Sequence, residues 1–160
     1  LDVRDVPTER QPALVLVDSA LAVPLDALLF AANRSAYIYT AVANEEKRRA
    51  LEALGTTVIT MPNNAGKVDL PVMLQDLGRR EINELHVEAG YKLNGSLLRE
   101  GLVDELLVYL APKLMGEGMG LAQMTPLTSL AEAHALSFHS VDRIGDDLRI
   151  LARLQGRDRF

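Results

Sequence analysis

The residues best suited to chemistry follow one short apolar run. Residues 85–88 (Leu-His-Val-Glu) predict a strand, a turn with Gly90 follows, and a helix is expected to begin within residues 93–96. Ligands of open α/β sheets bind beyond the carboxyl ends of strands, where helix N-termini present unpaired N–H groups to phosphates. Gly90 and Gly95 would let the backbone approach a phosphate, and Glu88 could accept hydrogen bonds. Spacing alone fits a plain strand-to-helix turn equally well.

Two further positions carry polar groups that a ligand could use. Ser19 follows the apolar run 13–18 and could hydrogen-bond a ribose or phosphate, although a turn residue that ends a strand is the simpler interpretation. Arg4 lies in an N-terminal segment with no clear partner and is more simply solvent-facing. The glycine-rich run 116–120 indicates a flexible connection rather than a phosphate loop, since no helix cap follows it closely.

Composition excludes several kinds of chemistry. Without cysteine there is no disulfide, thiolate metal site or cysteine nucleophile, and the three histidines lack metal-ligand spacing, so no metal is expected. A net charge of -5 without a basic block argues against nucleic-acid binding, and the apolar runs are too short to cross a membrane. No serine-centred nucleophile motif is present, so the chemistry is expected from a bound cofactor. A cytoplasmic location is expected.

The elements that must position these residues alternate between strands and helices. Strands are predicted at 13–18, 36–41, 56–61, 85–88 and 104–111, and helices at 44–54, 69–77 and 93–100. Asn44 and Asp69 are expected as N-caps, and Gly55 as the end of the first helix. Residues 136–144 and 148–154 alternate and predict an antiparallel hairpin. We therefore expect an α/β fold: a mainly parallel sheet flanked by helices, with a C-terminal antiparallel hairpin.

One long stretch resembles a known family. The run His86-Val-Glu-Ala-Gly90, Leu93-Asn-Gly-Ser-Leu-Leu, Gly101-Leu-Val-Asp-Glu-Leu and Tyr109-Leu-Ala-Pro-Lys-Leu-Met-Gly116 is similar to the C-terminal reductase domain of the bifunctional riboflavin protein RibD. The stretches Leu1-Asp-Val-Arg4 and Val17-Asp-Ser19 match as well, so the resemblance covers essentially the whole chain. It implies a dihydrofolate-reductase-like fold that uses NADPH to reduce 5-amino-6-(5-phosphoribosylamino)uracil to its ribitylamino product.

The resemblance also implies roles for individual residues. Substrate contacts fall on Leu1, Arg4 and Glu88. Cofactor contacts fall on Ser19, Gly90, Tyr91, Lys92, Leu93, Asn94, Gly95 and Ser96. Tyr91 and Lys92 stand where many relatives have Pro-Thr, which puts the side-chain contribution of those two positions in doubt. The proton donor is not identified.

The chain matches the reductase part of the family only. We expect a single reductase domain over residues 1–160 that starts inside the family domain, with the preceding strand and the zinc deaminase half absent. A catalytically incompetent fragment that serves as a dimerising structural core is therefore an alternative, because relatives are expected to pair as homodimers through this domain. A dihydrofolate reductase proper is a third interpretation, against which the long match argues.

Overall fold

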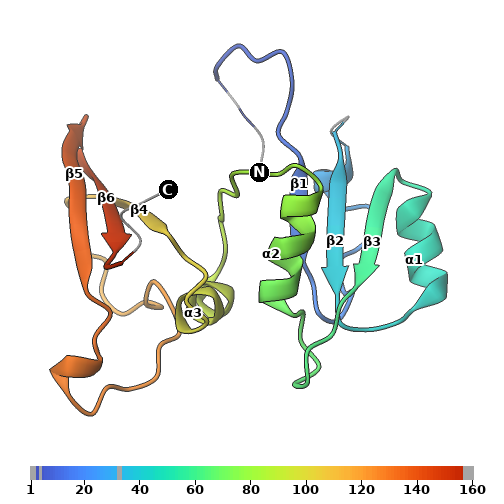
Figure 1. The fold of residues 1–160 in the computed structure, drawn as a ribbon. Coiled ribbons are helices and arrows are strands. Elements are labelled where there is room, and N and C mark those ends of the chain that lie inside the picture. Colours follow the sequence, from blue (N-terminus) through green and yellow to red (C-terminus); the bar gives the residue numbers. More distant parts are fainter. Residues whose placement is uncertain (1–2, 4, 32–33, 157–160) are drawn as a thin grey trace. The chain divides into compact units, whose positions relative to one another are not determined.

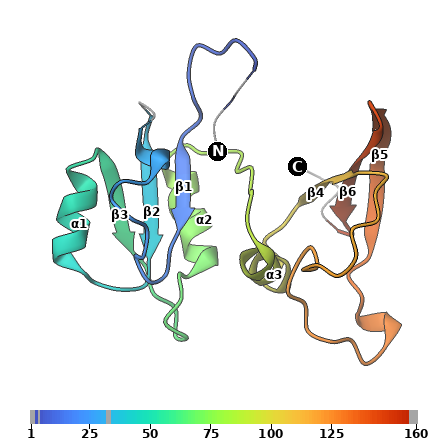
Figure 2. The ribbon, with the colours of Figure 1, turned by 180° about the vertical axis from the view of Figure 1, so that it is seen from behind.

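The computed structural model describes residue 3, residues 5–31 and residues 34–156. Contacts within the chain group into two compact units, Leu1–Glu88 and Ala89–Phe160. Figures 1 and 2 show the elements from opposite sides. The single domain expected from the chain's length stays a prediction.

The first unit is a parallel three-stranded sheet with a helix on each face. Its elements are β1 (Leu14–Val17), β2 (Ala36–Thr40), α1 (Glu45–Glu52), β3 (Thr56–Thr60) and α2 (Leu70–Arg79), with a one-turn 3₁₀ helix at Leu28–Phe30. The strands pair in the order β1-β2-β3. This arrangement confirms the three predicted strands and both helices to within two residues at most ends.

The alternating directions of the side chains along β2 show which helix covers which face of the sheet. Ile38 packs with Leu51 of α1 and Val58 of β3, while the next residue, Tyr39, donates a hydrogen bond to Asp76 of α2. Successive strand side chains point to opposite faces, so α1 and α2 must cover opposite faces of the sheet. Both Ile38 and Tyr39 are buried. The sheet is thus covered on both sides, as its near-continuous apolar strands indicate.

The helix caps of the first unit are local and follow the sequence. The Asn44 side chain accepts a hydrogen bond from the N–H of Lys47, and that of Asp69 accepts one from the N–H of Val72. Gly55 has a φ of 83°, a left-handed conformation that costs glycine little. All three predictions are confirmed.

The second unit combines one helix with an antiparallel sheet. Its elements are α3 (Tyr91–Arg99), β4 (Glu105–Leu110), β5 (Leu136–Ile144) and β6 (Asp147–Leu154), with a one-turn 3₁₀ helix at Leu130–Glu132. The strands pair in the order β4-β6-β5, so the predicted hairpin is confirmed. The α/β class is confirmed, but the described strands form two three-stranded sheets, and β4 belongs to the antiparallel one.

One predicted strand is wrong. Residues 82–90 are neither helix nor strand, although 85–88 has the composition of a strand. A strand is stable only when its N–H and C=O groups are paired, and no strand of either described sheet pairs with this segment. Val87 and Glu88 are exposed there.

Candidate functional site

Helix α3 begins with an open N-terminus. Gly90 is the N-cap in an extended conformation (φ -82°, ψ 171°), and no described side chain caps the helix. The first hydrogen bond of the helix runs from the N–H of Asn94 to the carbonyl of Gly90 at 3.1 Å, so the N–H groups of residues 91–93 precede it. A Cβ added to Gly90 would meet nothing within 4 Å. These N–H groups and the positive end of the helix dipole suit a diphosphate.

The helix starts two residues earlier than the sequence predicts. The prediction placed its first residues at 93–96, whereas α3 begins at Tyr91. The difference matters because it brings Gly90, Tyr91 and Lys92 into the turn that would face a ligand. Lys92 is exposed there, and its carbonyl accepts a hydrogen bond from the Ser96 hydroxyl at 3.3 Å.

Asn94 and Gly95 face the protein's own backbone. The Asn94 side-chain amide donates to the carbonyls of Ala89 and Leu121, both at 3.1 Å. Gly95 is buried so close to Gln123 that an added Cβ would lie 2.3 Å from the Gln123 carbonyl oxygen. The two residues therefore hold α3 against a segment more than twenty-five residues downstream.

Glu88 ends the first unit, just before this turn. Its side chain is 60% exposed, and one carboxylate oxygen lies 3.7 Å from Nε2 of His86, itself 64% exposed. An ion pair between such exposed groups contributes little to stability. The Glu88 carboxylate is therefore free of any buried structural role and available to a ligand.

Ser19 lies at the carboxyl edge of the parallel sheet, as predicted. Its hydroxyl accepts a hydrogen bond from the N–H of Val68 at 3.1 Å, and its carbonyl accepts from the N–H of Ala41 at 3.1 Å. The hydroxyl joins the end of β1 to the loop that follows β3, and it keeps its own proton for donation to a ligand.

Sequence reasoning missed two groups at this edge. Thr40, the last residue of β2, is fully buried, and its hydroxyl donates to the Ser19 carbonyl at 3.4 Å. The Asn63 carboxamide oxygen accepts from the N–H groups of Ala65 and Lys67, both at 2.9 Å, which fixes the loop after β3. Their positions in the sequence could have identified them, because both residues end or follow parallel strands, as Ser19 does, and ligands bind at that edge of such sheets.

Leu1 and Arg4, the remaining predicted substrate contacts, lie outside the described residues. Gly90 is the N-cap of α3, and residues 91–96 are the first six residues of that helix. The structure places Ser19 in the first unit, with the loop after β3.

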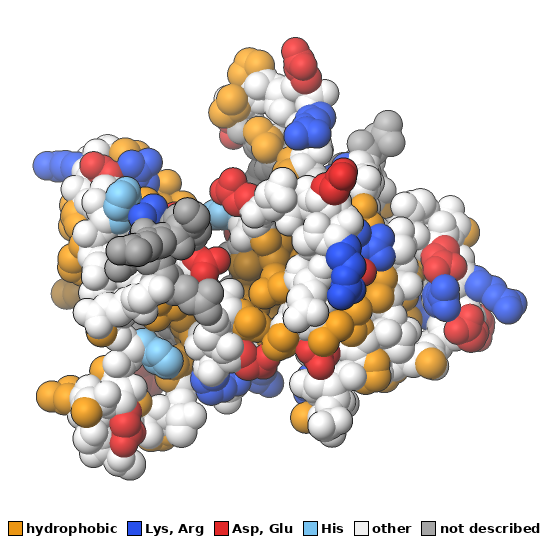
Figure 3. All heavy atoms as spheres, in the orientation of Figure 1, with side chains coloured by type: hydrophobic (Ala, Val, Ile, Leu, Met, Phe, Trp, Pro, Cys, Tyr) orange, Lys and Arg blue, Asp and Glu red, His pale blue; other side chains and the backbone are white. Residues whose placement is uncertain are grey.

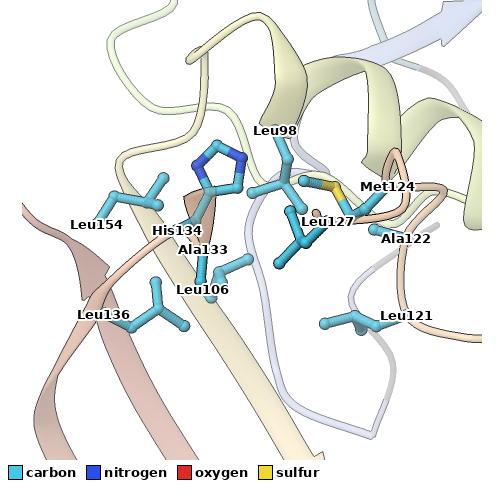
Figure 4. A pocket seen from close by; sticks show the side chains of 10 residues that line it. All are labelled: Leu98, Leu106, Leu121, Ala122, Met124, Leu127, Ala133, His134, Leu136 and Leu154. Atoms are coloured by element: carbon cyan, nitrogen blue, oxygen red, sulfur yellow. The ribbon is translucent and has the colours of Figure 1, made fainter. Parts of the chain in front are cut away.

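A cavity of about 340 Å³ lies elsewhere in the second unit. Figure 4 shows the lining side chains converging from α3, the sheet and the connection before β5. They are Leu98, Leu106, Leu121, Ala122, Met124, Leu127, Ala133, His134, Leu136 and Leu154. Only His134 among them carries a polar side chain, so this cavity does not suit a phosphate-bearing ligand.

The described acidic and basic side chains bear on two other kinds of site, a metal site and a charged patch. Within the described ranges, no group of three or more His, Asp and Glu side chains could hold a metal ion. Arg48 lies between Glu45 and Glu52 on α1, and Figure 3 shows opposite charges interspersed there. None of the helices described is long and apolar enough to cross a membrane.

The chain is similar in sequence to known proteins over most of its length. The family model of the RibD C-terminal domain matches residues 1–150. Riboflavin biosynthesis protein RibD of Escherichia coli strain K12 is 37% identical over 141 residues, which are 87% of this chain and 37% of that protein. The 5-amino-6-(5-phosphoribosylamino)uracil reductase of Buchnera aphidicola is 34% identical over 97 residues, covering 60% of this chain and 47% of that protein.

The fold is shared with solved structures as well. RibD of Acinetobacter baumannii superimposes with a TM-score of 0.78 at 23% identity, covering 96% of this chain and 41% of that one. The chain thus spans less than half the length of these three relatives.

Proposed function

Because the chain belongs to the family of RibD C-terminal domains, we propose that it reduces 5-amino-6-(5-phosphoribosylamino)uracil with NADPH in riboflavin biosynthesis. The observation that carries this proposal is the open start of α3, where the N–H groups of residues 91–93 precede the first helical hydrogen bond. The names of the relatives, RibD and 5-amino-6-(5-phosphoribosylamino)uracil reductase, supply the substrate.

The predicted residues that the structure describes near the start of α3, together with Ser19 and Glu88, take roles that their surroundings permit. The N–H groups at the start of α3 bind the cofactor diphosphate, and Gly90 leaves room for it because no side chain stands there. Ser19 donates its hydroxyl proton to a cofactor ribose or phosphate. Glu88 accepts hydrogen bonds from the ribose hydroxyls of the substrate and so orients the carbon to be reduced. Leu1 and Arg4 complete the substrate contacts, with Arg4 on the phosphate or ring edge.

The reaction itself is a two-electron reduction of the substrate ribose at C1. With the ribose ring opened so that C1 forms an imine, NADPH held at the start of α3 would supply a hydride to C1, and a proton from an acid or from water would go to the nitrogen. The protein's contribution is to hold the acceptor carbon in position. We place this reaction in the cytoplasm.

We also propose that the protein is a homodimer that pairs through the sheet of the second unit. One face of that sheet carries Leu110, Leu148, Phe138 and Val141, as the strand register shows. All four are exposed, Phe138 to 72%. Apolar patches of this kind mark interfaces, and a second copy would cover this one.

Substrate-dependent oxidation of NADPH, followed with chromatography of the ribitylamino product, tests the proposed activity. In the full natural protein that contains these residues, we expect Glu88→Gln to lower kcat/KM roughly tenfold to a hundredfold, because orienting contacts of one charged group are lost. Glu84→Gln is the matched control, since Glu84 is also exposed in the same segment and should leave the rate unchanged. Dimerisation without NADPH binding or turnover would instead establish the alternative, a structural core that lacks catalysis.

A further inference from the structure

Residues 121–123 of the same chain contact the start of α3. They belong to the connection between β4 and β5 and have no regular secondary structure. The N–H of Gln123 donates to the Tyr91 carbonyl at 2.9 Å, and the Leu121 carbonyl accepts from Asn94 at 3.1 Å. The side chain of Arg99 donates to the Gln123 carbonyl. We call residues 121–123 the strap.

Asn94 has no donor left for a ligand. Its amide nitrogen carries two hydrogens, and the carbonyls of Ala89 and Leu121 each accept a hydrogen bond from that nitrogen. Exchanging the amide oxygen and nitrogen would set an oxygen against two carbonyl oxygens, so the orientation is fixed by the network. A phosphate group needs donors, and the remaining Asn94 oxygen can only accept.

Gly95 shows that the strap must lie close to the helix. The gap between α3 and Gln123 leaves no room for a side chain, because an added Cβ would approach the backbone of Gln123 to 2.3 Å. The contact is therefore made by backbone against backbone. Displacing the strap would remove the Leu121 acceptor from the Asn94 amide, whose other hydrogen bond holds the Ala89 carbonyl just before the N-cap Gly90.

From these contacts we propose that Asn94 is a positioning residue: it couples the strap to the turn at residues 89–91 and so sets the geometry of the N–H groups that would bind the cofactor diphosphate. This inference rests on the proposed function for the identity of the ligand. The coupling between strap and turn stands on the hydrogen bonds alone. Asn94 acts on the cofactor through the backbone and does not touch it.

The test combines hydrogen exchange of the ligand-free protein with NADPH titration, in the full natural protein. Asn94→Ala should speed amide exchange at Gln123, whose N–H donates to the Tyr91 carbonyl, and at residue 94, whose N–H donates to the Gly90 carbonyl. It should weaken NADPH binding about tenfold, which corresponds to the loss of roughly one hydrogen bond. At saturating NADPH, kcat should be retained while the KM for NADPH rises. Asn64→Ala is the matched control, because Asn64 is exposed in a loop of the first unit and should change neither measurement.

Two further measurements keep the proposal falsifiable if Asn94→Ala folds poorly. Asn94→Asp keeps the side-chain size but removes both donors, so exchange in the strap should rise as it does in Asn94→Ala. In the unmodified protein, NADPH should slow exchange at Gln123, because coupling between two sites is reciprocal.

Each outcome has one meaning. Unchanged exchange in Asn94→Ala and Asn94→Asp would show that Asn94 does not hold the strap. Faster exchange with unchanged NADPH affinity, or no protection of the strap by NADPH, would show that the strap does not set the turn. Failure of the unmodified protein to bind NADPH would overturn both the proposed function and the cofactor part of this inference. Amide exchange in the ligand-free variants would still show whether Asn94 holds the strap against the turn.

Discussion

Replacing Tyr39 with phenylalanine tests how β2 is fastened to α2. The Tyr39 hydroxyl donates to the Asp76 carboxylate at 2.7 Å, and Nε of Arg80 donates to the same oxygen at 2.7 Å. Arg80 also lies over the Tyr37 ring, 5.0 Å from its centre. Tyr39 is fully buried, so its hydroxyl depends on this one acceptor.

The magnitude follows from the charge and exposure of the acceptor. A hydrogen bond to a charged group contributes roughly 1.5–3 kcal/mol. The Asp76 side chain is 19% exposed and keeps Arg80 as a partner, so water can replace the lost hydroxyl in part. We therefore expect Tyr39→Phe to lower the free energy of unfolding by about 1.5 kcal/mol, near the lower end of that range.

Urea unfolding followed by circular dichroism at neutral pH measures this loss. With a slope of roughly 1–3 kcal/mol per molar urea, the midpoint should fall by about 0.5–1.5 M. Tyr37→Phe is the matched control, because Tyr37 lies on the same strand and no hydrogen bond of its hydroxyl is found among the described residues. A loss below about 0.3 kcal/mol for Tyr39→Phe, or an equal loss for both variants, would refute the reasoning, since errors of a few tenths are usual in such comparisons.

The pH dependence gives an independent check with a definite sign. Hydrogen bonds from Arg80 and Tyr39 lower the pKa of Asp76 below its ordinary value of 3.8, so this stabilisation is present above 3.8 and is lost as the pH falls through the lowered value. Burial and the Asp76 hydrogen bond raise the pKa of Tyr39 above its ordinary 10.0, so that stabilisation is lost as the pH rises beyond 10.0. The difference between the native protein and Tyr39→Phe should therefore be largest between these limits.

Three other substitutions test the interface, a cap and a turn. Phe138→Glu should dissociate the proposed homodimer by burying a charge, which sedimentation velocity would detect; a dimer of unchanged strength would place the interface elsewhere. Asp69→Ala removes the 3.1 Å hydrogen bond to the N–H of Val72 and should cost about 1 kcal/mol in urea unfolding, whereas no loss would mean that the cap is dispensable. Gly55→Ala should cost about 1 kcal/mol through its left-handed φ of 83° alone, since its Cβ would meet nothing within 4 Å; a more stable variant would contradict that.

Features that depend on near neighbours in the chain could be predicted from the sequence. Asn44 and Asp69 cap their helices because a short acceptor side chain needs only the N–H groups three residues ahead. The hairpin of β5 and β6 follows from alternation and from Gly145, which has a φ of 62° in the turn. Because these signals depend on residues close together in the chain, tertiary packing did not change the predicted structure at these positions.

Features that depend on residues far apart in the chain could not be predicted from the sequence. The run 85–88 has the composition of a strand, but composition does not provide the second strand that pairing requires. The approach of Gln123 to Gly95 joins segments without a shared periodic pattern, and the only sequence signal was a glycine inside a helix. The turn at Gly90 was identified, although its helix begins two residues earlier than predicted, because Gly90 caps it without a side chain.

Backbone recognition explains which candidate positions should tolerate change. The side chains of Ser19 and Asn94 already hold backbone groups of the protein, and Gly90 and Gly95 act through the absence of a side chain. The groups left for a diphosphate at the start of α3 are N–H groups, which every residue except proline carries. Tyr91 and Lys92 stand where many relatives have Pro-Thr. A proline at position 91 would lack its N–H, but the N–H groups of residues 92 and 93 do not depend on the side chain, so the diphosphate site can survive this difference if the backbone keeps its conformation. Replacements at residues 94 and 95 change that conformation, whereas a side chain at residue 90 would keep the backbone and occupy the space left for the ligand. Sensitivity to substitution at residues 94 and 95 should therefore follow backbone geometry rather than exposure or charge.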